Sequence, residues 1–330
     1  MEFLLSSLYS VGAIALEEFW AFSGLKDFVE VASSGDLERI LSQEGLYALA
    51  APLIPFLLLS EILAMIARGN FHWRNIRVPM LAYVVNRVIA RAFTLSFAFA
   101  LMGFLQPFAL FQVEFSWYGF IYGYLVFEFS HFIYHWLGHR VRLFWCLHAT
   151  HHVPEHMNLS VSYAHFFLEA PFADLIRVGL CTLLGMPMEL VLLVAGIDSI
   201  WGHVIHVSEE VLPDGRLGWL GRFVLTPSHH RIHHSRNALY KDRNFCNLLP
   251  VWDRLFGTYQ EEVAGERPEY GITRDIDANN LYDAYCSEVV CLARDVLRTP
   301  GVANKVRLLF MPPGWTPESV RVQAERAAGR

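Results

Sequence analysis

Histidine is concentrated in one part of this 330-residue chain. Of its 15 histidines, only His72 lies outside the stretch from His131 to His234. Histidines scattered for packing or solubility would not gather in this way. Because imidazole is a good ligand for iron, zinc, copper and nickel, the distribution predicts a metal centre.

The spacing of these histidines is helical. His135 and His139 are four residues apart, so on a helix both imidazoles face the same side about one turn apart. His131 extends that face by another turn. The pattern H-x-x-H-H then occurs twice, at residues 148–152 and 230–234. These eight box histidines exceed what one ion can bind, so the sequence predicts two metals that share them.

Long apolar segments accompany the boxes. Hydrophobic residues make up 54% of the chain and charged residues 18%, against roughly 45–50% and about 25% in soluble domains, and the mean hydropathy is +0.32. Membrane-spanning helices need about 20 apolar residues. The segments that meet or approach this length are 47–67, 92–111, 115–137 and 178–201. The last is broken at 185–187, which predicts a helical hairpin; a buried helix pair remains the alternative.

Arginine placement gives an orientation. Arginines follow the first segment (Arg68, Arg74, Arg77) and the third (Arg140, Arg142), whereas residues 106–117 have no lysine or arginine. By the positive-inside rule these ends are cytoplasmic, so we expect the boxes on the cytoplasmic face of a bacterial inner membrane or endoplasmic reticulum.

The same patterns predict three regions. Residues 1–45 form an interfacial or short-helix region, with a loop and a short helix over 22–45. Residues 46–260 contain the transmembrane helices and the histidine-box catalytic domain. Residues 261–330 form a cytosolic helical tail.

Several functions are disfavoured by what the sequence lacks. The net charge of −6 argues against nucleic-acid binding. The five cysteines include no C-x-x-C pair, which argues against a zinc ribbon or disulfide framework. Neither H-E-x-x-H nor G-x-S-x-G is present. With no G-x-G-x-x-G and no cysteine set for an iron–sulfur cluster, electrons for any redox reaction must come from a separate donor.

The boxes resemble the fatty acid hydroxylase / sterol desaturase superfamily over roughly residues 128–259. The segment HRVRLFWCLHATHH at 139–152 is similar to the family's linker between its first two boxes. TPSHHRIHHSRN at 226–237 and VWDRLFGTY at 251–259 are most similar to the alkylglycerol monooxygenase branch. The resemblance implies an all-α membrane protein, in which a transmembrane four-helix bundle carries a cytosolic, histidine-rich cap with a di-metal site.

The resemblance also implies the site residues. The implied metal ligands are His135, His139, His148, His151, His152, His206, His230, His233 and His234. His206 fits an additional family histidine after the hairpin, and His203 is a rival for that place. Residues in or beside the boxes are expected to support the ligands, as metal-binding histidines usually hydrogen-bond a neighbour that fixes the ring tautomer. The candidates are Glu128, His131, Asn158, Asp198, His203, His229, Asn237, Asn244 and Asp253.

The expected reaction is oxygen-dependent hydroxylation of a lipid, a sterol or an ether lipid. Attack on aliphatic C–H bonds requires a redox metal, which excludes zinc as the working ion. Two irons are therefore expected, although zinc is able to replace them in isolated protein. The alternatives are a desaturase with the same site and, less favoured, a membrane zinc hydrolase.

The partners follow from this reaction. They are a lipid from the bilayer, dioxygen and an external electron donor. The donor is expected to be a ferredoxin or cytochrome with its reductase, ahead of a reduced pterin, since Arg140 stands where the alkylglycerol branch has a pterin-linked glutamate.

Overall fold

The computed structural model describes residues 13, 16–20, 22–90 and 94–317. Within them the chain is helical and contains no β-strand, only an isolated bridge between Ser235 and Tyr270. The all-α prediction is therefore confirmed for the described residues. The chain divides into two compact units, residues 1–71 and 72–330.

The first unit contains α2 (Leu25–Ser33), α3 (Leu37–Leu41), α4 (Gln43–Ala50) and α5 (Leu53–Ala67). Asp36 and Ser42 begin α3 and α4 because their side chains accept hydrogen bonds from the first free backbone N–H groups. Residues 22–45 are therefore mostly helical, not the loop with one short helix that their polar composition predicted.

One stretch in the described part of the chain, Gly45–Ala67, is long and apolar enough to cross a bilayer. It coincides with the first predicted span, and only its length and composition support a membrane role. The second predicted span, 92–111, begins with residues 92 and 93, which lie outside the described residues, and continues as α7 (Thr94–Leu105), a shorter apolar helix. The four-helix transmembrane bundle and its cap therefore remain predictions.

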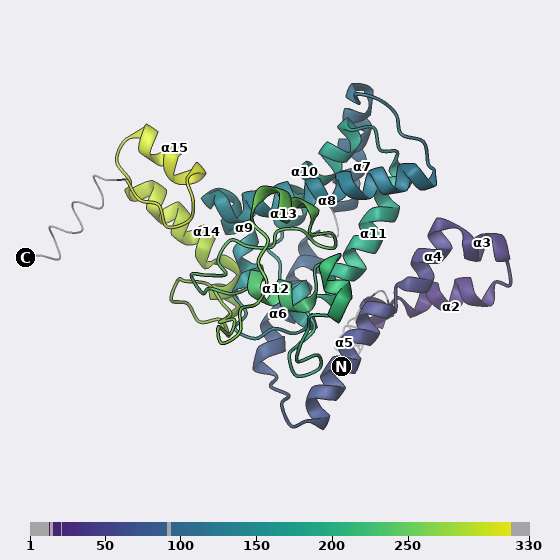
Figure 1. Ribbon diagram of the computed structural model, residues 1–330, viewed down its shortest axis with the longest axis horizontal. Helices are drawn as coiled ribbons and strands as arrows, with labels where there is room; N and C mark the ends of the chain where they lie inside the picture. The colour runs from purple at the N-terminus through teal and green to yellow at the C-terminus, as the bar shows by residue number, and fades with distance from the viewer. Residues whose placement is uncertain (1–12, 14–15, 21, 91–93, 318–330) are drawn as a thin grey trace, which may run out of the picture. The chain divides into compact units, whose positions relative to one another are not determined.

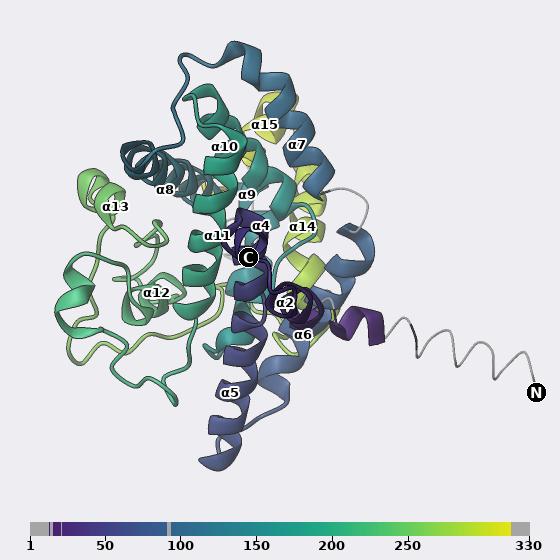
Figure 2. The same ribbon diagram turned by 90° about the vertical axis from the view of Figure 1, so that its right-hand side faces the viewer.

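The second unit is arranged around α8 (Trp117–Arg140). Helices α9 (Arg142–His152), α10 (Glu169–Leu183) and α11 (Met188–Val204) pack on α8, and α7 packs on α10 (Figures 1 and 2). Their shared core includes Tyr124, Phe127, Cys181, Leu190 and Val194. Full burial of an aliphatic or aromatic side chain contributes about 1.5–3 kcal/mol, so this core fixes the helix carrying the first histidines.

The break predicted at 185–187 is the turn between α10 and α11. Gly185 has a φ of +81°, and an added Cβ would lie 2.4 Å from the Phe111 carbonyl oxygen. Only glycine adopts this conformation without strain. The turn therefore ends α10 here and lets α11 return along α8.

The remaining elements surround the ends of these helices: α6 (Arg74–Ala90), η1 (Gln106–Phe108), η2 (Leu159–Tyr163), η3 (Gly218–Arg222), α12 (Pro227–His233), α13 (Val251–Phe256), α14 (Leu281–Arg298) and α15 (Val302–Phe310). Helices α14 and α15 pack against α9. The backbone N–H of Arg142 donates to the Met311 carbonyl at 3.0 Å, which holds the chain after α15 against the start of α9.

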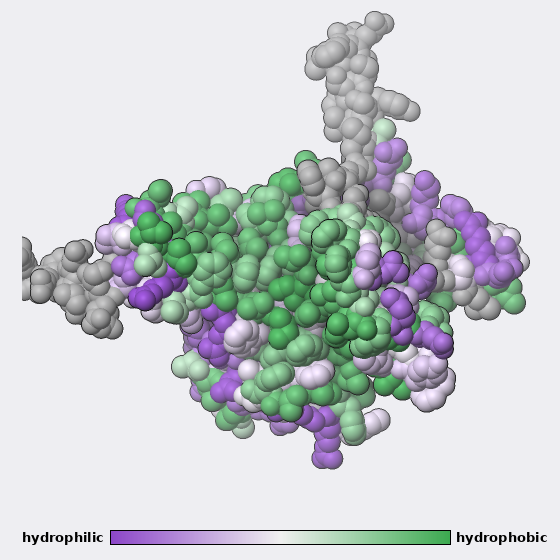
Figure 3. Space-filling view, turned by 90° about the horizontal axis from the view of Figure 1, so that it is seen from above, coloured by the Kyte–Doolittle hydropathy of each residue, from purple (hydrophilic) through white to green (hydrophobic). Residues whose placement is uncertain are grey.

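Large apolar side chains are exposed on α7, on the segment between α7 and α8, and on the first turns of α8. They are Phe97, Phe99, Phe104, Phe108, Leu110, Phe111, Phe115, Trp117, Tyr118, Ile121 and Leu125. Figure 3 shows apolar side chains gathered over a broad area of one face. Soluble monomers rarely expose so large an apolar surface.

Candidate metal centre

Nine buried histidines converge in two adjacent groups. Within each group the ring nitrogens lie within 4.8 Å of one another. The first group has five members and the second has four. They are His135, His139, His148, His152 and His233 in the first, and His151, His206, His230 and His234 in the second. The structure thus brings together all nine residues that the sequence proposed as ligands, including His206 but not His203.

The two H-x-x-H-H boxes contribute to both groups in opposite ways. In the box on α9, His148 and His152 join the first group and His151 the second. In the box on α12 and its cap, His230 and His234 join the second group and His233 the first. With 3.6 residues per turn, the first and last histidines of a box are about 40° apart around the helix axis, whereas the histidine just before the last is about 100° from it. Each box therefore connects the two groups.

Backbone carbonyls orient three of the rings through Nδ1. The Nδ1–H of His135 donates to the Phe245 carbonyl at 2.8 Å, and that of His233 donates to the Arg243 carbonyl at 2.8 Å. The His206 Nδ1 lies 2.5 Å from the Gly202 carbonyl. A carbonyl oxygen only accepts, so the proton of each neutral ring is on Nδ1 and the Nε2 lone pair is free.

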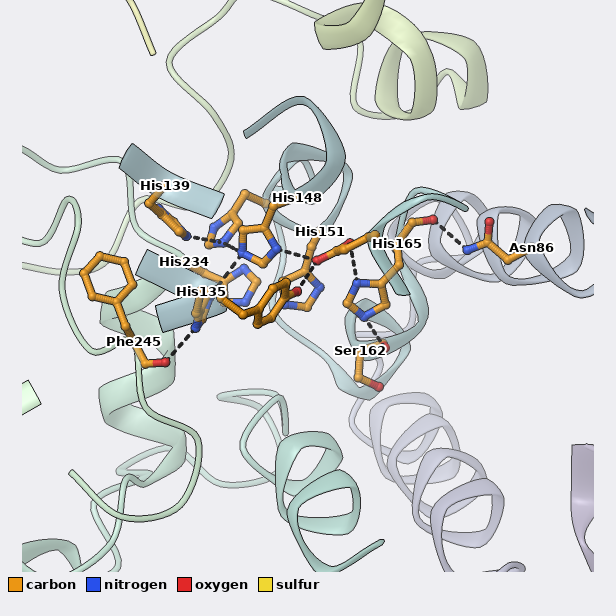
Figure 4. A network of polar contacts seen from close by, with 12 residues as sticks. Asn86, His135, His139, His148, His151, Ser162, His165, His234 and Phe245 are labelled. Carbon is orange, nitrogen blue, oxygen red and sulfur yellow. Dashed lines mark hydrogen bonds and ion pairs between the residues drawn. The ribbon is translucent and has the colours of Figure 1, made fainter. Parts of the chain in front are cut away.

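Two carboxylates orient two further rings. Glu169 lies 2.5 Å from the Nδ1 of His148, and its carboxylate also binds the Nδ1 of His165 at 2.8 Å and the Tyr134 hydroxyl at 2.6 Å; Figure 4 shows His148, His151 and His165 around this network. Asp242 is 3.5 Å from the Nδ1 of His139. A carboxylate behind a ligating imidazole is a common feature of metal sites because it fixes the tautomer and raises ligand basicity.

The freed Nε2 atoms face one another. Those of His135 and His148 are 3.1 Å apart, and those of His206 and His230 are 2.9 Å apart. Similar separations of 3.0–3.2 Å join His139, His148 and His152 in the first group, and His151, His206, His230 and His234 in the second. Two lone pairs at this distance repel unless a cation lies between them.

These histidines are set to stay neutral. Burial lowers the pKa of His206 to about 3 and that of His139 to about 4. Burial, reinforced by neighbouring histidines, also holds the pKa values of His151, His152, His230 and His234 well below the ordinary value. Protons therefore do not compete effectively for the Nε2 lone pairs near neutral pH.

The donor set fits transition-metal ions. Two imidazole nitrogens bound at about 2.1 Å and at right angles on one ion would lie about 3.0 Å apart, close to the separations found. The buried Nε2 of His233 has no hydrogen-bond partner among the described residues, which suits a metal ligand. With five nitrogens in one group and four in the other, the residues present fit two ions.

Two of the predicted supporting residues, Asp253 and Glu128, act on the site through the backbone and not through a ligand ring. Asp253 accepts the backbone N–H groups of Phe245 and Cys246, each at 2.8 Å, and so positions the carbonyl that binds His135. Glu128 is fully buried and accepts the backbone N–H groups of residues 247–249 at 2.6–3.2 Å. Glu128 therefore holds the loop after the third box against α8, and Asp253 holds it against α13.

Asp198 and His131 lie beside the centre as a pair. Their Oδ2 and Nδ1 atoms are 3.5 Å apart, and the His131 ring meets that of His135 edge to face, with centroids 5.6 Å apart. Asp198 also fixes the loop through its backbone, because its carbonyl accepts from the Asn247 amide at 2.7 Å.

The other predicted supporting residues bind elsewhere. His203 hydrogen-bonds the Ser199 carbonyl of its own helix at 2.7 Å. His229 bonds Thr226 and the Tyr259 hydroxyl. The three asparagines, Asn158, Asn237 and Asn244, stabilise turns and loops. None of these five hydrogen-bonds a ligand ring within the described residues.

Sequence reasoning missed Glu169, Asp242 and the three orienting carbonyls. Glu169 is 17 residues beyond His152 in the apolar context FFLEAPF, outside every box. A lone carboxylate among apolar residues was the available signal, because burial of such a charge is costly unless it is paired.

Two cavities reach the centre from different directions. The larger cavity has a volume of about 590 Å³ and meets His135, His148, His151, His206 and His230. Much of its wall is apolar, with Ala98, Phe127, Phe166, Ala173, Val178, Val191, Leu192 and Ala195. The smaller cavity has about 350 Å³ and meets His139, His152, His233 and His234. Its wall includes Arg142, Trp145, Arg236, Lys241, Asp242, Arg274 and residues 312–314.

Residues 120–258 match the family described as fatty acid hydroxylase. The chain is similar to alkylglycerol monooxygenase of Homo sapiens, with 30% identity over 207 residues, 63% of this chain and 44% of the relative. The alkylglycerol monooxygenase of Xenopus tropicalis is 30% identical over 197 residues, which cover 59% of this chain and 42% of the relative.

A bacterial relative is also similar. The ornithine lipid hydroxylase of Rhizobium tropici is 26% identical over 191 residues, 56% of each chain. The matched part of the chain thus spans less than half the length of the alkylglycerol monooxygenases. No solved structure matches. The resemblance drawn from the boxes, including its alkylglycerol branch, is confirmed.

Proposed function

From the match of residues 120–258 to the fatty acid hydroxylase family, we propose that the protein is a membrane-bound lipid hydroxylase that uses dioxygen and two iron ions. The convergence of nine buried histidines through free Nε2 atoms, beside a cavity with a largely apolar wall, supports this function most directly. The relatives named as monooxygenase and hydroxylase agree with it.

The chemistry of the donor set favours a redox enzyme. Two redox-active ions bound here would supply the activation of dioxygen that attack on an aliphatic C–H bond requires. A zinc hydrolase needs a general base placed beside the metal. The nearest carboxylates, Glu169 and Asp242, are instead directed at the Nδ1 atoms of ligand rings. In this position they orient the ligands and do not activate a water molecule.

The protein itself would hold and orient the reactants. Phe245, Arg243 and Gly202 fix the ligand rings through their carbonyls, so the metal positions are set before the substrate binds. The larger cavity would take the lipid chain, because its apolar wall leads directly to five of the histidines. This wall would also exclude water from the oxidised carbon.

We place the domain at a membrane, with the centre on the cytoplasmic side. The apolar stretch Gly45–Ala67 and the exposed aromatic side chains of α7 support contact with lipid. The arginines after the first and third predicted spans support the orientation. A lipid substrate would then reach the larger cavity from the bilayer.

Electrons would reach the centre from a separate donor through the smaller cavity. Lys241 and Arg236 lie at its wall and are exposed, so they are available to an acidic redox protein. Two arginines near the boxes are not available. Arg231 is buried and donates to the carbonyls of Val207, Leu212 and Pro213, and Arg142 is buried against Asp295.

The test combines metal analysis with product analysis. Purified protein should contain about two metal ions per chain, and iron-loaded protein in lipid should consume oxygen when given a reducing partner. Lipid extracts of cells with and without the protein should differ by hydroxylated species. A single ion per active chain, or lipid hydrolysis without oxygen uptake, would contradict the proposal. A new double bond in the lipid would instead identify a desaturase.

A further inference from the structure

The larger cavity continues beyond the histidines along α10, where it meets Asp174, Arg177 and Val178. The opposite wall there is apolar, formed by Phe127 of α8 and by Val191, Leu192 and Ala195 of α11. Arg177 is the one arginine or lysine among the residues that line this cavity. An isolated cation in such surroundings is costly unless it is paired or has a ligand.

The guanidinium of Arg177 is held in place by aromatic rings. Its central carbon is 5.3 Å from the centroid of the Tyr134 ring and 5.9 Å from that of Phe127. These distances are in the range of cation–π contacts. Such contacts fix the position of the group but use none of its hydrogen-bond donors.

Those donors have no acceptor within the described residues. The Nε of Arg177 is buried without a hydrogen-bond partner. The nearest carboxylate oxygen, on Asp174, is 3.9 Å from a terminal nitrogen, which is beyond hydrogen-bonding distance. The side chain is 25% exposed. Arg177 thus presents unused donors where it meets the cavity.

The position of Arg177 relates it to the reaction site. The Tyr134 ring lies between the Arg177 guanidinium and the metal ligands, since the ring centroid is also 6.0 Å from that of His135 and 6.1 Å from that of His148. A group bound by Arg177 would therefore sit about one aromatic ring away from the metal ligands. This is close enough to determine which carbon of a bound lipid reaches the centre.

The charge of the neighbourhood limits what Arg177 binds. Asp174 is close enough to balance the arginine but does not occupy its donors. A phosphate or a free carboxylate would add negative charge beside Asp174, whereas a neutral carbonyl oxygen would accept from the guanidinium without this repulsion. Hydrogen bonds from a charged donor are stronger than neutral ones.

We propose that Arg177 binds the ester or amide carbonyl of an acyl lipid and thereby sets which carbon lies at the histidine centre. The inference rests on the proposed function, because it treats the larger cavity as the substrate site. Arg177 acts here as a specificity residue. It takes no part in oxygen chemistry.

The test measures binding without turnover. Purified protein in nanodiscs is titrated with methyl palmitate, palmitamide, palmitic acid and hexadecane, each displacing a fluorescent alkyl probe. Arg177→Met removes the donors and keeps much of the bulk, and Arg177→Lys keeps the charge. The control is Arg298→Met, an exposed arginine that lines neither cavity.

The expected pattern is selective. Arg177→Met weakens binding of the ester and the amide by about tenfold or more, as for loss of a hydrogen bond to a charged donor, and leaves hexadecane unchanged. Arg177→Lys gives intermediate affinity for the two carbonyl lipids, and Arg298→Met behaves as wild type. In turnover, Arg177→Met raises KM more than it lowers kcat and spreads oxidation over several carbons.

Three outcomes would overturn the inference. Equal weakening for hexadecane would show that Arg177 only shapes the cavity. A loss confined to palmitic acid would show that it binds carboxylates. Unchanged binding of all four lipids would show that it binds none of them. Carbonyl-selective binding in protein that consumes no oxygen would instead count against the hydroxylase proposal alone.

Discussion

The two cavities beside the metal centre differ in what they present to the same histidines. The larger one meets five of them, from α8, α9, α12 and the turn after α11, and much of its wall is apolar. The smaller one meets four others, and its wall carries the exposed basic residues Arg236, Lys241 and Arg274 together with Asp242 and Glu288. Apolar walls select a hydrocarbon chain, whereas exposed charges select a polar or charged partner.

This difference implies that the lipid and the electron donor reach the same metal centre by separate routes. A hydrocarbon and a charged electron donor are incompatible in one apolar pocket, because burial of charge in such a pocket is costly. Separate approaches let both reactants reach the metals in one catalytic cycle. The comparison predicts that substitutions on one side change the handling of one reactant only, whereas substitutions at the centre stop both.

The largest effect is expected at the histidines themselves. His151→Ala, reached from the larger cavity, and His233→Ala, lying at the smaller one, should each reduce activity by more than about 100-fold, because loss of an outer partner alone costs about 10–100-fold. Metal analysis should show fewer ions per chain. The control is His156→Ala, an exposed histidine beside the second box, which should stay within about twofold. Near-normal activity in either box variant would disprove the ligand assignment.

The two orienting carboxylates, Glu169 and Asp242, should differ in how much they contribute to metal affinity. Glu169 lies 2.5 Å from His148 and its side chain is 2% exposed, whereas Asp242 is 3.5 Å from His139 and 19% exposed. Glu169→Gln should lower metal affinity by about 10–100-fold, and Asp242→Asn by less. Retention of metal during titration with a chelator measures both. A larger loss in Asp242→Asn would reverse the ranking that burial implies.

A bulky substitution in one cavity should impair the handling of one reactant and leave the other unaffected. Ala195→Phe narrows the larger cavity and should raise KM for the lipid by about tenfold, equivalent to 1.4 kcal/mol, without slowing reduction of the metals by a donor. Thr273→Phe, at the wall of the smaller cavity, should slow reduction and leave lipid binding unchanged. Stopped-flow reduction and lipid titration are the measurements. If both variants impaired the same step, the two cavities would not serve separate reactants.

The smallest effect is expected from surface charge. Lys241→Glu should slow reduction by an acidic donor protein by up to about fivefold at low salt, in line with 0.2–1 kcal/mol for an exposed charge pair. The difference should vanish at high salt because exposed charges are screened. Lys305→Glu on α15, which lines neither cavity, serves as the control. A salt-independent effect would point to a structural role for Lys241.

Much of the candidate site could be read from histidine spacing. Residues three and four apart share a helix face, so the boxes predicted convergent imidazoles, and the structure gathers the nine proposed ligands. The division into groups of five and four could not be predicted. It depends on how α9 and α12 approach each other, which places His151 and His233 each in the group opposite to the rest of its box.

The supporting residues were less predictable, since they were chosen for proximity in sequence. Asn158 and Asn237 lie beside boxes but stabilise local turns, as asparagine commonly does. Glu169 lies outside the boxes and reaches His148 only because α10 packs along α8. Asp253 and Glu128, which were expected to support the ligand rings, hold backbone N–H groups instead.

The sequence by itself determined the helical class of the described residues, the break at Gly185 and the eight box histidines that converge, because each depends on local periodicity or on the backbone freedom of one residue. Only the tertiary structure decided the pairing of the groups, the carbonyls and carboxylates behind the rings, the burial of Arg231, and the two cavities with Arg177 at the wall of one. These features depend on contacts between segments far apart in the chain, and local sequence patterns do not predict which segments meet.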